Sequence, residues 1–230
     1  MDDFGGKLAV ITGGGTGMGR ALALQLVAEG CDIAMCDVSR DNLAECSALC
    51  AAQAPQGVRV TTHIVDVANR EDVARFHDEV IEQHHCESIN LLFNNAGVGG
   101  GGSFLTDPIE QWERTYNICW GGVYHCSRAF MPLLVAADEA HLINTSSING
   151  FWASMGPGRP HTAYSAAKFA VKGFTEALVN DLRTHAPHVG VSVVMPGHVG
   201  TSILINSAKL LGRDDPLNMA GQAELNEEEQ

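Results

Sequence analysis

The sequence predicts a single α/β domain with a doubly wound parallel sheet and helices on both faces, and three observations lead to this fold class. Short apolar runs bounded by turn residues alternate with segments of helical periodicity along most of the chain. The length of 230 residues suits one domain. A content of 45% hydrophobic and 18% charged residues is typical of a globular protein.

The individual elements follow from these patterns. Strands are expected at the short apolar runs, which are residues 8–12, 32–36, 59–65, 90–94, 141–145 and 191–195. Helices are expected between and after them, at residues 19–29, 40–52, 70–84, 108–136 and 164–185. Because strand and helix alternate, right-handed crossovers between parallel strands are predicted. Ligands of such sheets bind at the carboxyl ends of the strands.

Charge and composition exclude several classes of protein. A net charge of −13 with only 14 lysine and arginine residues argues against a nucleic-acid partner. No stretch approaches the ~20 apolar residues of a membrane span, and no basic signal region precedes the first strand. A protein of the cytoplasm is therefore expected. Seven cysteines without a C-x-x-C spacing indicate reduced thiols.

A glycine-rich segment joins the first predicted strand to the first predicted helix. Residues 12–19 read T-G-G-G-T-G-M-G. Free backbone N–H groups and the positive end of the helix dipole favour an anion there, such as a pyrophosphate. The candidates for cofactor binding in this loop are Gly13, Thr16, Gly17, Met18 and Gly19. A glycine-rich turn without a ligand is the alternative.

Asp37 follows the second predicted strand, 24 residues beyond Gly13. A carboxylate at this place accepts hydrogen bonds from ribose hydroxyls and repels a 2′-phosphate. NAD is therefore expected as the cofactor, and NADP is less favoured. Arg40 leaves NADP open, because an arginine three residues further on can reach a phosphate.

Tyr164 and Lys168 are four residues apart in a predicted helix, so both side chains project from one face. Tyrosine is a poor base at neutral pH, but a nearby lysine cation stabilises the phenolate. Such a pair can exchange a proton with an alcohol or a carbonyl compound. A Y-x-x-x-K spacing by itself is more often part of an exposed helix, so its meaning depends on the other motifs.

Together the motifs resemble those of the short-chain dehydrogenase/reductase family, whose members have a Rossmann-type domain. The resemblance covers residues 7–203 and rests on the glycine loop, Asp66-Val67, N-N-A-G at residues 94–97, Asn117, Ser147, Tyr164 with Lys168, and Pro196-Gly197 followed by Thr201. It implies an NAD-dependent oxidoreductase that interconverts a secondary alcohol and a ketone, with Tyr164 as acid and base. Two alternatives stay open: a non-catalytic dinucleotide-binding regulatory protein, and a related epimerase or dehydratase.

The resemblance also implies roles for single residues. The adenosine half of the cofactor would contact Asp66, Val67, Asn94, Ala96 and Gly97, and the nicotinamide half Thr145, Lys168, Pro196, Gly197, Val199 and Thr201. Ser147 would polarise the substrate oxygen, with Ser146 as a second candidate. Asn117 would hold a water molecule that relays protons to Lys168.

The substrate side departs from the family pattern. Ser147 and Tyr164 are 17 residues apart, more than is common in the family, and the extra residues fall at 155–160. An apolar pocket, and hence an apolar alcohol or ketone, is expected from Phe151, Trp152, Met155, His161 and residues 98–104. Ordinary packing of Phe151 and Trp152 is the alternative.

Three further expectations concern the chain end, assembly and metals. The resemblance implies that residues 202–230 hold part of a substrate lid and an acidic tail, and that the last strand of the family sheet is missing. It also implies a homodimer or homotetramer, formed through the predicted helices 108–136 and 164–185. The H-H-C run at residues 84–86 has no partner at zinc-ligand spacing, so no metal is expected.

Overall fold

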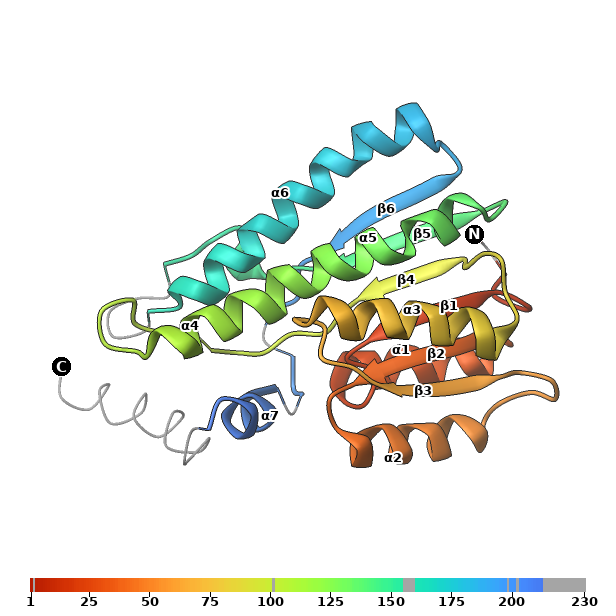
Figure 1. The fold of residues 1–230 in the computed structure, drawn as a ribbon, viewed down its shortest axis with the longest axis horizontal. Helices are drawn as coiled ribbons and strands as arrows, with labels where there is room; N and C mark the ends of the chain where they lie inside the picture. Colours follow the sequence, from red (N-terminus) through yellow and green to blue (C-terminus); the bar gives the residue numbers. More distant parts are fainter. Residues whose placement is uncertain (2, 101, 155–159, 198, 202, 213–230) are drawn as a thin grey trace.

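The computed structural model describes residues 1, 3–100, 102–154, 160–197, 199–201 and 203–212 (Figure 1). One parallel sheet has the strand order β3-β2-β1-β4-β5-β6. Its strands are β1 (Leu8–Thr12), β2 (Asp32–Asp37), β3 (Val60–Ile64), β4 (Leu91–Asn94), β5 (Ala140–Thr145) and β6 (Val189–Val194). The chain winds outward from β1 in one direction and from β4 in the other, so the predicted doubly wound sheet is confirmed.

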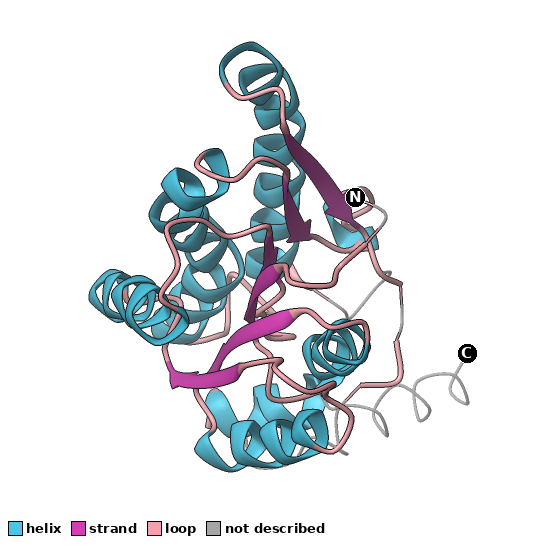
Figure 2. Ribbon diagram, turned by 90° about the vertical axis from the view of Figure 1, so that its right-hand side faces the viewer, coloured by secondary structure: helices cyan, strands magenta, loops and turns pink. Residues whose placement is uncertain are grey.

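Helices cover both faces of the sheet, as Figure 2 shows from its edge. They are α1 (Gly17–Ala28), α2 (Arg40–Ala51), α3 (Arg70–His84), α4 (Ile109–Tyr116), α5 (Gly122–Val135), α6 (Thr162–His185) and α7 (Ile203–Leu210). Alternate residues of β1 point to opposite faces. Leu8 and Val10 pack into a core with residues of α3, α5 and α6, whereas Ala9 and Ile11 pack with α1 and α2.

The long helix predicted over residues 108–136 is divided in the structure. A π turn, η1 (Asn117–Gly121), separates α4 from α5, and the N–H of Gly122 bonds to the carbonyl of Asn117. Glycine at position 122 has a packing reason, because a Cβ there would lie 2.6 Å from Cγ2 of Val67. Single π turns inside α-helices are frequent at functional sites, and this one lies beside the carboxyl edge of the sheet.

Four other expectations concern the thiols, membrane spans, metal ligands and the end of the chain. All seven cysteines are free. Among the described residues, no helix has both the length and the apolar character needed to cross a membrane, and no three His, Cys, Asp or Glu side chains are grouped to hold a metal ion. Helix α7 occupies the start of the expected lid. The expected tail at 213–230, the residues 155–159 of the longer segment and Gly101 of the 98–104 run lie outside the described residues.

Candidate active site

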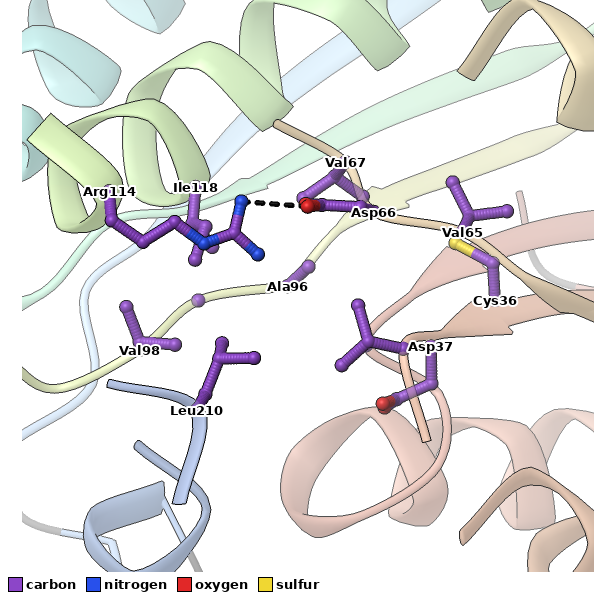
Figure 3. A pocket seen from close by; sticks show the side chains of 13 residues that line it. Cys36, Asp37, Val65, Asp66, Val67, Ala96, Val98, Arg114, Ile118 and Leu210 are labelled. Atoms are coloured by element: carbon purple, nitrogen blue, oxygen red, sulfur yellow. Dashed lines mark ion pairs between the residues drawn. The ribbon is translucent and has the colours of Figure 1, made fainter. Parts of the chain in front are cut away.

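Two adjoining pockets lie at the carboxyl ends of the parallel strands. The smaller, of about 80 Å³, is lined by Gly13 and Asp37 and by residues that follow β3 and β4 (Figure 3). The larger, of about 300 Å³, is lined by residues that follow β5 and β6 and by α6. Gly97 lines both pockets. The loop between β1 and α1 contributes Gly13 to one pocket and the first turn of α1 contributes Met18 to the other, so one extended ligand can span both.

The glycine loop is shaped by close backbone packing. Gly13 and Gly17 have φ angles of +65° and +55°, which favour glycine. A Cβ on Gly14 would lie 2.7 Å from Cβ of Met35, and one on Gly19 would overlap the carbonyl oxygen of Gly13. This packing fixes the loop against β2, where the N–H of Gly14 also donates a 3.0 Å hydrogen bond to the carbonyl oxygen of Cys36.

Two polar side chains tie the glycine loop to the end of β4: Thr12, the last residue of β1, and Asn95, the first residue after β4. The hydroxyl oxygen of Thr12 accepts hydrogen bonds from the N–H groups of Asn95 and Ala96, both 3.0 Å long. The side-chain amide of Asn95 donates to the carbonyl oxygens of Thr12 and Gly13, at 3.1 and 3.3 Å. Asn95 also lines the larger pocket. The position of the loop is thus tied to the end of β4.

Asp37 ends β2 and faces the smaller pocket. Its Oδ2 accepts a 3.1 Å hydrogen bond from the N–H of Gly15, and its Oδ1 accepts one of 3.0 Å from Ser39. These bonds fix the carboxylate beside the glycine loop. Cys36 lines the same pocket, and burial raises the pKa of its thiol well above the usual value, so the thiol stays protonated and unreactive.

The larger pocket brings together most of the residues expected at the nicotinamide end. Those that line it are Met18, Gly97, Thr145, Ser147, Tyr164, Lys168, Pro196, Gly197, Val199 and Thr201. Lys168 is only 3% exposed, and its Nζ lies 5.5 Å from the centroid of the Tyr164 ring. The same Nζ donates a 2.8 Å hydrogen bond to the carbonyl oxygen of Thr145. A buried cation therefore stands beside a phenol.

The two candidate serines differ in what their hydroxyls do. Ser146 Oγ donates a 2.7 Å hydrogen bond to the carbonyl oxygen of Lys168, so its proton is used to hold α6 against the end of β5. Ser147 Oγ accepts a 3.2 Å hydrogen bond from the N–H of Asn149. Both serines line the pocket, but the Ser147 hydroxyl keeps its proton to donate to a ligand oxygen.

Of the adenosine-side residues, Asp66, Val67, Ala96 and Gly97 line the smaller pocket and Asn94 does not. The Asn94 side chain is 2% exposed and points into the core between α5 and β5. Its amide donates hydrogen bonds to Ser127 Oγ and Asn144 Oδ1, at 2.9 and 2.8 Å. The Asn94 side chain therefore holds the sheet to a helix, and the ribose contact implied for Asn94 stays a prediction.

The structure places Asn117 outside both pockets, and its relay role stays a prediction. It begins the π turn, its side chain is exposed, and it does not line either pocket. Cys119, two residues further on, is fully buried, and its Sγ donates to the carbonyl oxygen of Val98 at 3.4 Å. A Cβ built on Gly97 would lie 3.6 Å from Nζ of Lys168 and 3.8 Å from Sγ of Cys119. Cys119 is thus the residue of this turn that faces the neighbourhood of Lys168.

Phe151 and Trp152 are 69% and 66% exposed and are not among the residues that line the larger pocket. The apolar wall comes instead from Ile148, Val199 and Ile203. Ile148 and Ile203 were not expected from the sequence, because neither belongs to a motif. Thr16, Gly17 and Gly19 shape the loop without lining either pocket.

Two further residues of the smaller pocket were not expected from the sequence. Arg114 of α4 and Leu210 of α7 line it together with Asp37 and Asp66. Nη1 of Arg114 forms a 2.7 Å ion pair with Oδ2 of Asp66 (Figure 3). Neither residue belongs to a motif, and no sequence signal marks them.

The family model for short chain dehydrogenases matches residues 7–210. The chain belongs to the short-chain dehydrogenase family. The resemblance predicted from the motifs is therefore confirmed. This short-chain dehydrogenase is 38% identical over 214 residues to the oxidoreductase SadH of Mycobacterium tuberculosis, which covers 93% of this chain and 74% of SadH.

Other similar proteins include enzymes named for their substrates. Meso-2,3-butanediol dehydrogenase of Serratia marcescens is 34% identical over 178 residues, 77% of this chain and 66% of that protein. A solved structure of a short-chain dehydrogenase/reductase from Burkholderia phymatum in complex with NAD has a TM-score of 0.80 at 35% identity. That match covers 89% of this short-chain dehydrogenase and 70% of the solved chain.

Proposed function

We propose that this short-chain dehydrogenase transfers a hydride between NAD and a secondary alcohol or ketone, with Tyr164 moving the proton. The observation that carries this proposal is one pocket lined by Ser147, Tyr164 and Lys168 together with Met18 of the glycine loop. A phenol, a buried cation and a hydroxyl donor thus face the space beside the cofactor loop. Alcohol oxidation and carbonyl reduction need these three groups for proton transfer and for binding the substrate oxygen.

The residues present fit a nicotinamide dinucleotide. A Cβ on Gly13, Gly14 or Gly15 would come within 3 Å of neighbouring atoms, so the loop has the close approach of bare backbone that a pyrophosphate requires. The first turn of α1 contains no acidic residue, and the Thr16 side chain does not cap it. Pockets on both sides of Gly97 offer room for the two halves of the cofactor. The NAD complex of the Burkholderia phymatum protein supports this cofactor.

The surroundings of Asp37 support NAD rather than NADP. Its carboxylate faces the smaller pocket and would repel a 2′-phosphate. Arg20 is engaged elsewhere, because its Nε donates to the carbonyl oxygen of Gly15 and its Nη2 pairs with Glu45 at 2.8 Å. Arg40 is exposed and does not line the pocket.

When bound, the nicotinamide ring accepts or supplies the hydride. The protein residues handle the proton. The ammonium group of Lys168, held by the Thr145 carbonyl, stabilises negative charge on the Tyr164 oxygen. Tyr164 therefore takes the proton of an alcohol during oxidation and returns it to a carbonyl oxygen during reduction. Ser147 donates a hydrogen bond to the same substrate oxygen and orients it.

The substrate side of the pocket favours an apolar alcohol or ketone. Ile148, Val199 and Ile203 form its apolar wall, and apolar walls favour apolar ligands. The likeness to meso-2,3-butanediol dehydrogenase supports the secondary-alcohol chemistry.

A panel of secondary alcohols with NAD, followed by the absorbance of the reduced nicotinamide, tests the proposal. We expect turnover that falls by at least about 100-fold in Tyr164→Phe. Tyr116→Phe is the matched control, because Tyr116 stacks on Trp112 and does not line the pocket. Tight NAD binding without turnover on any alcohol or ketone would favour the non-catalytic alternative. Altered sugar or diol products without net NAD reduction would favour an epimerase or dehydratase.

We also propose that the protein forms a homodimer through α5 and α6. Tyr124 of α5 and Phe169 of α6 are 48% and 43% exposed, so both helices present apolar surface to solvent. A second copy would cover them. Light scattering that gives a monomer at micromolar concentration would contradict this assembly.

A further inference from the structure

The smaller pocket contains an ion pair that no motif accounts for. Arg114 and Asp66 are 31% and 30% exposed at their side chains, and Nη1 of Arg114 lies 2.7 Å from Oδ2 of Asp66. Figure 3 shows the guanidinium extending from α4 across the pocket toward the carboxylate. Because both residues line the pocket, this pair forms part of the surface that a ligand meets.

The lining of the smaller pocket suits a planar base. Val98, Ile118 and Leu210, from three different segments, give it apolar sides. Asp66 stands at one end and Asp37, the expected ribose acceptor, at another. If the dinucleotide of the proposed function lies along the glycine loop, its adenine base enters this smaller pocket.

The Asp66 carboxylate is held from two sides. Its Oδ1 accepts a 3.0 Å hydrogen bond from the N–H of Ala68, and its Oδ2 is held by Arg114. An ionised carboxylate has about four acceptor positions, so both oxygens can still accept from a ligand. Fixing the rotamer before binding removes the entropy cost of ordering it later.

We infer that Arg114 is a positioning residue for recognition of the adenine base, and this inference rests on the proposed function. By holding Asp66, Arg114 aims a carboxylate acceptor at the exocyclic amino group of the base. A base with an oxygen in place of that amino group presents an acceptor to an acceptor and is rejected. Among the described residues that line this pocket, Arg114 is the one cation, so it also offsets the combined charge of Asp66 and Asp37.

The test compares the dissociation constants of NAD and of nicotinamide hypoxanthine dinucleotide, in which an oxygen replaces the adenine amino group. We expect the wild-type protein to bind NAD at least about tenfold more tightly, as the loss of one charge-assisted hydrogen bond predicts. Arg114→Met should reduce this ratio to less than about threefold, and Arg114→Lys should restore most of it, because lysine can still pair with Asp66. Asp66→Asn should also abolish the preference for NAD over the hypoxanthine dinucleotide.

Arg75→Met is the matched control. Nη1 of Arg75 pairs with Oδ1 of Asp72 at 2.6 Å, and Oδ2 of Asp72 accepts from the N–H of Asp66. This arginine therefore supports the same turn from outside the pocket, and its loss should leave the ratio unchanged. Thermal unfolding of each variant shows that it is folded.

The outcomes separate the two proposals. If Arg114→Met weakens both dinucleotides equally and keeps their ratio, Arg114 contributes charge or packing only, and the inference is overturned while NAD binding stands. An equal fall of the ratio in Arg75→Met would also overturn it. If the wild-type protein binds neither dinucleotide, the proposed function fails, and the inference fails with it.

Discussion

The ammonium group of Lys168 donates a 2.8 Å hydrogen bond to the carbonyl oxygen of Thr145, the last residue of β5. This bond joins the helix that carries Tyr164 to the edge of the sheet. The lysine is 3% exposed, so the bond satisfies part of a buried charge without a carboxylate partner. A carboxylate there would neutralise the cation that the proposed phenolate needs, whereas a carbonyl oxygen leaves its charge in place.

Lys168→Met should lower the turnover number by at least about 100-fold, because the phenolate of Tyr164 loses its stabilising cation. The variant also leaves the Thr145 carbonyl without its donor, at a cost of about 1–3 kcal/mol in the free energy of unfolding. Steady-state kinetics and thermal unfolding measure the two effects. Lys172→Met is the control, because Lys172 is one turn further along α6 and forms an exposed ion pair with Glu176. Turnover of Lys168→Met within threefold of the wild type would contradict the proposed role.

Asp37→Asn should relax the preference for NAD over NADP. Asparagine keeps an oxygen that can accept from the N–H of Gly15, but it removes the charge that repels a 2′-phosphate. We expect the ratio of kcat/KM for the two cofactors to shift toward NADP by at least about tenfold, which corresponds to ~1.4 kcal/mol. Asp41→Asn, in the exposed first turn of α2, is the charge-matched control. An unchanged ratio in Asp37→Asn would show that another residue decides cofactor choice.

The fold was readable from the sequence because its signals are local. Buried central strands such as β1 give short apolar runs, and all six predicted runs became strands of the sheet. The π turn at Asn117–Gly121 was not predicted, since helical periodicity continues on both sides of it. Its register leaves the Asn117 side chain exposed and buries that of Cys119, which helical periodicity alone does not reveal.

The candidate site was readable where its residues follow a strand directly or form a spaced motif on one helix. Ser147, Tyr164 and Lys168 lie on or next to elements whose ends meet at one edge of the sheet. Arg114 and Leu210 reach the smaller pocket only through the packing of α4 and α7. These contacts join segments that are distant in sequence, so no local spacing of residues predicts them.

Asn94→Ala should destabilise the protein more than it weakens cofactor binding. The Asn94 amide links Ser127 to Asn144, whose own amide donates a 3.0 Å hydrogen bond to Thr175. Removing it leaves buried polar groups unpaired, so we expect a loss of about 1–3 kcal/mol in the free energy of unfolding. The dissociation constant of NAD should change by less than about threefold. Denaturant unfolding and NAD titration measure the two quantities.

Asn95→Ala is the comparison for that prediction, because the neighbouring amide holds the carbonyls of Thr12 and Gly13 in the glycine loop. Here we expect weaker NAD binding. The opposite pattern, with NAD binding lost in Asn94→Ala and kept in Asn95→Ala, would contradict this prediction and support the ribose contact expected for Asn94.

A buried histidine pair between β3 and α3 gives the protein a predictable acid sensitivity. Nδ1 of His63 lies 2.7 Å from Oε2 of Glu79, and Thr61 Oγ1 lies 2.9 Å from Nε2 of both His63 and His84. With both rings neutral, His63 donates to Glu79 and accepts from Thr61, so His84 must donate its Nε2–H to Thr61. Within the described part of the chain, Nδ1 of His84 has no hydrogen-bond partner, and it is the nitrogen that a proton would occupy.

Burial lowers the pKa of His84 from 6.5 to about 4, and the charge of Arg59 acts in the same direction. The unfolded chain therefore binds a proton at this residue as the pH falls below 6.5, while the folded protein does not until about 4. Stability is fully present above the unfolded value and is lost as the pH falls across that window, by up to about 3 kcal/mol. His84→Gln should flatten this part of the stability curve, measured by urea unfolding at several pH values. His185→Gln, which changes an exposed histidine, should not flatten it. A curve for His84→Gln as steep as that of the wild type between these pH values would assign the acid sensitivity to other groups.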